Sequence, residues 1–376
     1  MRLSDAETPR LLLDPDRLQR NIDAMAARCA ELGVTLRPHL KTPKSVKVAE
    51  CAVPDKAGPI TVSTLREAEA FAEAGYTDIL CAAATAPTKL AHADRIQRAT
   101  KARVILVTDS VALVEAADAK ADELGATFEF LIEIDCGEHR SGVQPVSPEL
   151  LAIARALTQS NALSLAGVMT HAGHSYALDD PEQIADLAEV ERAAAADSAD
   201  ALRAEGHDCR IVSVGSTPTV LFARHLEGVT EARAGVYLFW DLAQYSRNIC
   251  TLDDIAVTVL ATVIGHNRAG RSLVLDSGAL ALSKDDSSNA FAPDTRYGYL
   301  CDAGTLERFD GLSVDKVYQE HGIVPVTDET WFDRLPVGAQ VRVMPVHTCM
   351  TCAAYDAYDV VRDGEIAETW PRVNGW

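Results

Sequence analysis

The chain has 376 residues, of which 48% are hydrophobic and 24% are charged, so it is long enough for one large domain and a second, smaller one. Its formal net charge of -20 disfavours nucleic acid and anionic membrane surfaces as partners, because both would repel it. Small molecules are therefore the expected ligands.

The cysteines and the N-terminal segment indicate the compartment. Nine cysteines are scattered through a chain that is too large to need disulfide bonds for stability, which is typical of reduced thiols in a cytosol. The first ten residues, MRLSDAETPR, lack the apolar stretch of a signal peptide. No other stretch approaches the roughly 18 apolar residues of a membrane span. We expect a cytoplasmic protein.

The first two thirds of the chain alternate short apolar runs with longer helical patterns, which is typical of repeated βα units. The helical patterns include residues 16–31, 64–75, 111–124, 148–158 and 181–204. The apolar runs that we predict to be strands lie at residues 34–37, 59–62, 78–82, 103–107, 128–134, 164–170, 210–214 and 233–237.

Eight strands are the number that a closed parallel barrel needs, although an open doubly wound sheet has a similar pattern. The position of the polar residues favours the barrel. Lys41, residues 135–140, residues 171–174 and residues 215–219 all follow predicted strands. In a (β/α)8 TIM-type barrel, the ends of the strands form the catalytic rim.

After residue 250 the pattern changes to alternating strands broken by Gly, Pro and Asp clusters, as in IAVTVLATVIG and VRVMPV. This part reads as an antiparallel β domain. We therefore predict an α/β barrel over residues 26–250 and a β domain over residues 251–376, with residues 1–25 packing on the β domain.

Several residues at the predicted rim have side chains that could bind a ligand or take part in catalysis. Lys41, in RPHLKTPKS, could be a Schiff-base lysine or a solvated surface lysine. Arg140, in DCGEHRSGV, could bind an anion or a phenolate oxygen, or pair with Glu138. His171 and His174, in THAGHSY, could act as acid/base groups or stack on a ring.

A Ser/Thr/Gly-rich loop, VGSTPT (214–219), offers the hydroxyl and N–H donors of a phosphate site. The same composition also occurs in ordinary turns. RAGVY (233–237) would complete the site one strand later, because TIM barrels commonly bind phosphate after strands 7 and 8.

In the β domain, PVHTCMTC (345–352) ends a predicted strand and places His347 and Cys349 two residues apart, on one face of an extended chain. An imidazole and a thiolate suit zinc, with other coordination positions left for water or substrate. Cys349 and Cys352 also form a C-x-x-C pair, which could be half of a structural zinc site or a redox pair. We favour His347 and Cys349 as ligands, with Cys352 filling the core.

Taken together, these segments resemble the D-serine dehydratase and D-threonine aldolase group of pyridoxal-phosphate enzymes, which share the alanine racemase-like fold (fold type III). The resemblance extends from TPRLLLDPDRLQRNI (8–22) through RPHLKT, DCGEHRSGV, THAGHSY, VGSTPT and RAGVYLFWD to VHTC. It departs from many relatives at Pro43, where they have a histidine.

The resemblance assigns a role to each segment. It implies that Lys41 holds pyridoxal 5'-phosphate as a Schiff base and takes the α-proton, and that Arg140 contacts the phenolic oxygen of the cofactor. Tyr176 would lie near the pyridine nitrogen, and His347 and Cys349 would bind the metal. The groups that it implies around the phosphate are Ser216, Thr217, Gly235 and Tyr237.

The expected reaction acts on a D-amino acid with a 3-hydroxyl group. A dehydratase would eliminate water to give an enamine that hydrolyses to a 2-oxo acid and ammonia, and the His-x-Cys pair matches the zinc form of that enzyme. An aldolase, with Mn²⁺ or Mg²⁺, would instead give glycine and an aldehyde, with His171 or His174 as the base. A pyridoxal-phosphate carrier without catalysis is a third possibility. Because relatives of this fold are usually dimers, the resemblance also implies a homodimer.

Overall fold

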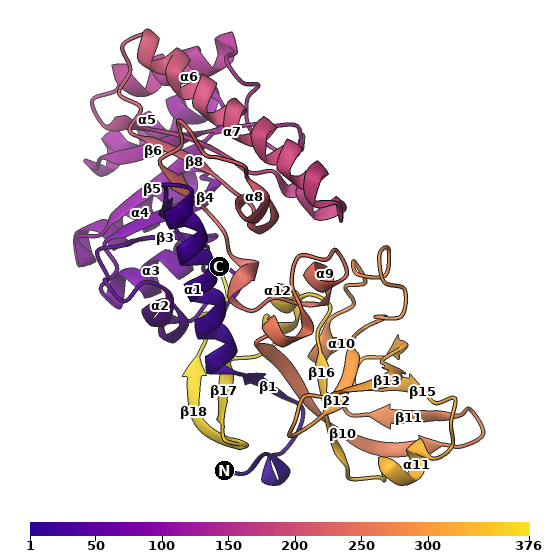
Figure 1. Ribbon diagram of the computed structural model, residues 1–376. Helices are drawn as coiled ribbons and strands as arrows, with labels where there is room; N and C mark the ends of the chain where they lie inside the picture. Colours follow the sequence, from indigo (N-terminus) through magenta and orange to yellow (C-terminus); the bar gives the residue numbers. More distant parts are fainter. The chain divides into compact units, whose positions relative to one another are not determined.

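The computed structural model describes residues 1–376, which form two compact units. The barrel unit comprises Asp23–Gly235 and Gly375–Trp376, and the β unit comprises Met1–Ile22 and Val236–Asn374. In Figure 1 the barrel unit is drawn mainly in indigo to magenta and the β unit mainly in orange to yellow. Residues 236–250 therefore fold with the β unit.

The barrel unit contains one sheet of eight parallel strands, and the (β/α)8 fold predicted from the sequence is confirmed. Going round the barrel, the strand order is β2-β9-β8-β7-β6-β5-β4-β3. The strands are β2 (Thr35–Leu36), β3 (Pro59–Val62), β4 (Asp78–Ala84), β5 (Arg103–Thr108), β6 (Phe128–Ile134), β7 (Leu163–Thr170), β8 (Ile211–Val214) and β9 (Glu231–Ala232).

The barrel closes between the segment after β2 and strand β3. The backbone N–H of Leu40 donates to the carbonyl of Thr61 (2.8 Å), and the N–H of Thr61 donates to the carbonyl of Pro38 (2.9 Å). These bonds form a parallel bridge between His39 and Thr61. Closure removes both free edges of the sheet, which would otherwise leave backbone groups unpaired.

Each barrel strand except β9 is followed by a helix that buries apolar side chains, and the N-caps show why several of these helices begin where they do. Thr64, Ser110, Ser147 and Asp180 each accept a backbone N–H at a helix start. The helices are α1 (Pro15–Glu31), of which only Asp23–Glu31 belongs to this unit, α2 (Val46–Ala52), α3 (Leu65–Glu73), α4 (Leu90–Thr100), α5 (Val111–Leu124), α6 (Pro148–Gln159), α7 (Pro181–Ala204) and α8 (Thr217–Phe222). Figure 1 shows α7 as a long helix along this unit.

An ion network is buried where the barrel closes. Arg37, only 2% exposed, donates to both oxygens of Glu231 at 2.8 Å, to Asp78 at 2.9 Å and to the carbonyl of Ile60 at 3.2 Å. Its partners come from β9, β4 and β3, so a single guanidinium joins the strands on both sides of the closure.

The predicted strand at residues 233–237 is wrong in its position. The eighth strand is Glu231–Ala232, and Val236–Leu238 forms a short 3-10 helix, η4. The prediction misplaced the strand because its first residue, Glu231, is charged, although its side chain points into the barrel toward Arg37. The more apolar residues come after the strand.

The β unit is built on antiparallel pairing, as predicted, with one parallel pair between β1 and β17. Its main sheet has the order β13-β12-β16-β10-β1-β17-β18, and β11, β15 and β14 extend it from β10. Its strands are β1 (Arg10–Leu13), β10 (Val257–Asn267), β11 (Ser272–Leu275), β12 (Tyr299–Asp302), β13 (Arg308–Ser313), β14 (Lys316–Val317), β15 (Gly322–Pro325), β16 (Gln340–Met344), β17 (Ala357–Arg362) and β18 (Glu365–Pro371).

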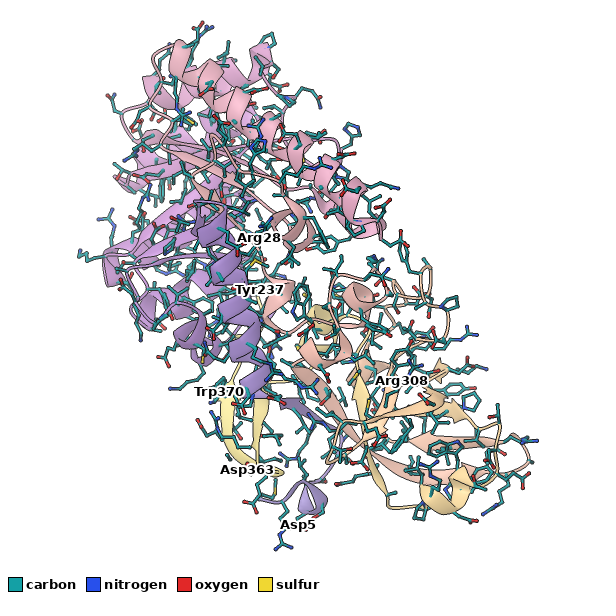
Figure 2. All side chains as sticks on the ribbon, in the orientation of Figure 1. Asp5, Arg28, Tyr237, Arg308, Asp363 and Trp370 are labelled. Atoms are coloured by element: carbon teal, nitrogen blue, oxygen red, sulfur yellow. The ribbon has the colours of Figure 1, made fainter.

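The hairpin between β17 and β18 turns at Asp363 and Gly364, which both have positive φ values (50° and 76°). An Asp-Gly pair favours this two-residue turn because both residues tolerate left-handed backbone. Figure 2 labels Asp363 at this turn and Trp370 on β18. Short helices α9 (Leu242–Tyr245), α10 (Ala279–Leu282), α11 (Trp331–Arg334) and α12 (Thr348–Cys352) lie between the strands. None of the helices is both long enough and apolar enough to span a membrane.

Arg37 gives a test of the barrel closure. We expect Arg37→Met to lower the free energy of unfolding by about 3–5 kcal/mol, because it leaves the carboxylate of Glu231 buried without its cation. Arg103 is the matched control, since it also pairs with Asp78 (3.7 Å) but its side chain is 35% exposed. Arg103→Met should cost at most about 1 kcal/mol. Urea unfolding followed by circular dichroism measures both values, and equal losses would contradict the structural role given to Arg37.

Candidate functional site

Lys41 lies immediately after the residues that close the barrel. The tight turn that carries it is held by a hydrogen bond from the backbone N–H of Lys44 to the carbonyl of Leu40 (2.8 Å). The backbone N–H of Lys41 donates to Nδ1 of His39 at 3.4 Å. Lys41 itself is exposed. The structure therefore places it on the rim of the barrel, where its side chain is accessible.

A group of nitrogen-containing side chains surrounds this position. Burial lowers the pKa of His39 well below its usual value, and the charges of Lys41, Arg233 and the neighbouring His171 lower it further. Burial likewise lowers the pKa of His171 to about 3, and Lys41 and Arg233 again contribute. Both imidazoles are therefore neutral near pH 7.

His171 is held by a hydrogen bond between its Nδ1 and the carbonyl of Gly215 (2.7 Å). Since a carbonyl only accepts, Nδ1 of the neutral ring carries the proton and Nε2 carries the lone pair. His174 lies one turn further on, in the 3-10 helix η3 (Gly173–Ala177), and its buried Nδ1 has no hydrogen-bond partner. The half-buried Tyr176 belongs to the same short helix.

Arg140 lies on the loop that follows β6. Asp135 shapes this loop by accepting the backbone N–H groups of Gly137 (2.8 Å) and His139 (3.0 Å). The side chain of Arg140 is 54% exposed, and its guanidinium is 3.8 Å from Glu133 and 3.6 Å from Glu138. Arg140 would have to exchange these carboxylates for any anionic ligand that it binds.

The hydroxyl-rich loop after β8 forms a compact, buried group. Ser216 caps α8 through a reciprocal pair of hydrogen bonds with Thr219. The hydroxyl of Thr217 accepts the backbone N–H of Gly235 (3.3 Å), which leaves its own proton for an anion. Gly215 has a φ of +138°, and a Cβ there would lie 2.1 Å from the carbonyl oxygen of Arg233. The structure thus brings Ser216, Thr217 and Gly235 together.

Glu191, on helix α7, connects this loop to the histidine loop. Its buried carboxylate accepts from the backbone N–H of Ala172 (2.8 Å), the backbone N–H of Gly215 (3.0 Å) and the hydroxyl of Thr219 (2.6 Å). Burial raises its pKa. No short motif marks Glu191, because it lies in the middle of a long helix whose pattern predicts only an apolar face.

Tyr237 lies on η4 and belongs to the β unit. It is fully buried, and Figure 2 labels its position. The structure therefore places this residue in a different unit from Ser216, Thr217 and Gly235.

The candidate metal ligands lie at the start of α12. His347 precedes the helix and Cys349 lies in its first turn, so the prediction of an extended chain here is wrong. The two side chains nevertheless meet, since the imidazole and the thiol form a hydrogen bond. The start of the helix brings them together, whereas an extended strand would have placed them on one face by alternation.

Two carboxylates hold this segment. Nδ1 of His347 lies 2.8 Å from Oδ2 of Asp285. The buried Asp241 accepts the backbone N–H of Thr348 (3.0 Å) and its hydroxyl (3.2 Å). Burial opposes a charge on His347, but the hydrogen bonds with Asp285 and Cys349 outweigh it and raise the pKa of the imidazole to about 11.

The donor set fits a metal that keeps open coordination positions. An imidazole nitrogen and a thiol are the ligands that zinc prefers. No cluster of three or more His, Cys, Asp or Glu side chains is placed to enclose an ion. Two protein ligands would therefore leave the remaining positions to water or to substrate.

Cys352 lies in a different environment from His347 and Cys349. It is completely buried and hydrogen-bonds with Tyr358, and burial raises the pKa of its thiol to about 12. None of the nine cysteines forms a disulfide.

Sequence reasoning missed five residues that shape these sites: His39, Glu191, Arg233, Asp241 and Asp285. His39 and Arg233 do lie within the segments RPHLKT and RAGVY, so their positions beside candidate residues were a usable signal. Asp285 lies in the polar stretch SKDDSSN, far from His347 in the sequence, and nothing in that stretch distinguishes it from Asp286.

Comparison with protein families divides the chain in a similar way. Residues 13–243 match the alanine racemase N-terminal domain, and residues 256–361 match the putative serine dehydratase domain. D-threo-3-hydroxyaspartate dehydratase from Delftia sp. (strain HT23) is 45% identical over 98% of this chain and 98% of its own length. A 3-hydroxy-D-aspartate aldolase from Paracoccus denitrificans (strain Pd 1222) is 30% identical over 98% of this chain and 92% of its own length.

The solved structure of the Delftia dehydratase agrees with these sequence matches. It superimposes with a TM-score of 0.95 at 44% identity and covers 100% of both chains. Two variants of that dehydratase have also been solved, one with a histidine replaced by alanine and one with a cysteine replaced by alanine in the metal-free form. The chain therefore belongs to the alanine racemase-like family, and it is a lyase that joins a racemase-type barrel domain to a serine dehydratase-type domain.

Proposed function

We propose that this protein is a pyridoxal-phosphate- and zinc-dependent dehydratase that eliminates water from a 3-hydroxy-D-amino acid. The enamine product then takes up one water and releases ammonia to give a 2-oxo acid. D-threo-3-hydroxyaspartate is the first substrate to test. The proposal rests on the 45% identity, over 98% of both chains, to a dehydratase of that compound. We also propose that the enzyme is cytoplasmic, since nine cysteines without a disulfide suit a reducing compartment. The homodimer is proposed from the resemblance to this fold family alone.

The barrel rim supports the choice of cofactor. Lys41 supplies an accessible amine, and both Lys41 and Arg233 lie close enough to His39 to lower its pKa. The buried hydroxyls of Ser216 and Thr217, with Gly235 beside them, suit the phosphate group, and a Cβ at Gly215 would collide with the neighbouring backbone. The proposal gives Arg140 the phenolic oxygen and Tyr176 the side of the pyridine nitrogen, and it includes Tyr237 among the residues around the phosphate.

The start of α12 supports the choice of metal. In the Delftia dehydratase, the histidine and the cysteine that were replaced lie two positions apart, and the cysteine variant was solved without metal. His347 and Cys349 have the same order and spacing here. A thiolate ligand favours zinc over the harder Mg²⁺ and Mn²⁺ ions, which prefer oxygen.

The bound groups would supply two kinds of chemistry: pyridoxal phosphate accepts electrons from the α carbon, and zinc polarises the 3-hydroxyl as a Lewis acid. The protein side chains do the rest. Nζ of Lys41 takes the α-proton of the substrate. His171 is neutral and oriented by Gly215, so its Nε2 can accept a hydrogen bond but holds a proton poorly. The buried Nδ1 of His174 has no hydrogen-bond partner in the protein, so it remains available to a bound group.

The reaction products distinguish the proposed dehydratase from an aldolase. With D-threo-3-hydroxyaspartate and the purified enzyme, we expect ammonia and oxaloacetate in equal amounts. Glycine and glyoxylate would instead show an aldolase, the activity named for the Paracoccus relative. D-serine and D-threonine test the breadth of the side-chain preference. Treatment with a chelator should abolish the activity and added zinc should restore it, whereas activity that is indifferent to chelation would refute the metal requirement.

Lys41→Ala tests the cofactor assignment. The variant should lose the visible absorption band of the lysine-bound cofactor, and its kcat should fall by about 1,000-fold or more, because it lacks the base for the α-proton. Lys47→Ala is the control, since the side chain of Lys47 is 55% exposed and pairs only with Glu50 on the same helix. A Lys41→Ala enzyme that kept the band would assign the cofactor to another lysine.

Replacing the two cysteines of the C-x-x-C pair in turn tests the metal assignment. Cys349→Ala should lose bound zinc in elemental analysis, because only one protein ligand would remain. Cys352→Ala should keep its zinc, because Cys352 is buried against Tyr358. If both variants lost zinc, with folding intact by circular dichroism, the pair would form a metal site together and His347 would not act with Cys349 alone.

A further inference from the structure

The contact between Asp285 and His347 determines which nitrogen of the imidazole faces a metal. Oδ2 of Asp285 is 2.8 Å from Nδ1 of His347. An ionised carboxylate can only accept hydrogen bonds, so Nδ1 must carry the proton. The lone pair of the neutral ring is then on Nε2, at the opposite side of the ring.

Asp285 is itself held in place by its own loop. Its second oxygen, Oδ1, accepts the backbone N–H of Ser287 at 2.9 Å, and its backbone N–H donates to the hydroxyl of Ser283 at 3.2 Å. Both carboxylate oxygens therefore have a fixed partner. The carboxylate can hold the imidazole in one orientation because its own rotation is restricted.

Arg247 anchors the far side of this loop. It is 7% exposed, and its guanidinium donates to the carbonyl of Ser287 (3.0 Å) and lies over the ring of Phe291, 4.4 Å from the ring centroid. It also donates to the carbonyl of Ala243 on α9. These contacts tie the loop to the helix that precedes it, so the position of Asp285 does not depend on its local turn alone.

We propose that Asp285 is the positioning residue of the metal site: it fixes the tautomer and the ring orientation of His347 so that Nε2 is ready to bind the ion. The proposal rests on the proposed function, because it assumes that His347 is a metal ligand. Carboxylates that accept the second N–H of a ligating histidine typically strengthen metal binding by about 10–100-fold.

Zinc titration against a chromophoric chelator measures this contribution directly. Asp285→Ala should weaken zinc binding by about 10–100-fold. Asp286→Ala is the matched control, since Asp286 is an exposed neighbour with the same charge, and its removal should leave the affinity unchanged. Asp285→Asn should recover part of the affinity, because its amide oxygen can still accept the Nδ1 proton.

Two further measurements separate positioning from a loss of folding or of the site. The thermal unfolding midpoint of the metal-free Asp285→Ala variant should match that of the metal-free Asp286→Ala variant. The cobalt-loaded Asp285→Ala variant should keep the thiolate-to-cobalt charge-transfer band of Cys349 but change its ligand-field bands. If the unmodified protein bound neither zinc nor cobalt, the proposed function would fail. If it bound them and the two alanine variants had equal affinity, the role of Asp285 would be disproved while the proposed function stood.

Discussion

The closure of the barrel between Thr61 and the segment that follows β2 is the constraint on which the barrel site depends. Two backbone hydrogen bonds join the segment after β2 to β3 at this point. The buried ion network of Arg37 adds bonds to β9 and β4. Lys41 comes directly after these bonds. Its position is therefore set by the geometry of the closed sheet, and the loop that carries it adds only one tight turn.

Much of the fold could be predicted because its burial pattern is regular. Strands covered on both faces are apolar along their whole length, and β6 lies at the predicted residues 128–134. Helices α5 and α7 also begin and end where their patterns and caps indicate. The eighth strand was misplaced because Glu231 is charged yet points inward, and only the distant Arg37 explains why it can do so.

The candidate site was only partly visible in the sequence. Residues that follow strands gather at one rim for topological reasons, so Lys41, His171 and Ser216 could be proposed without coordinates. The residues that hold these sites in place could not be predicted in the same way. Glu191 and Asp285 act over long sequence separations, through contacts that no motif records. His347 and Cys349 were chosen correctly as neighbours, but from a strand geometry that a helix start replaces.

The carboxylate of Glu191 has a consequence for attempts to redesign this enzyme. Because it accepts donors from two loops at once, a new conformation of one loop withdraws a hydrogen bond that the other also relies on. Loop sequences taken from a relative would therefore be expected to work only when both loops and the matching part of α7 are transplanted together. The three segments form a single exchangeable module, although they are far apart along the chain.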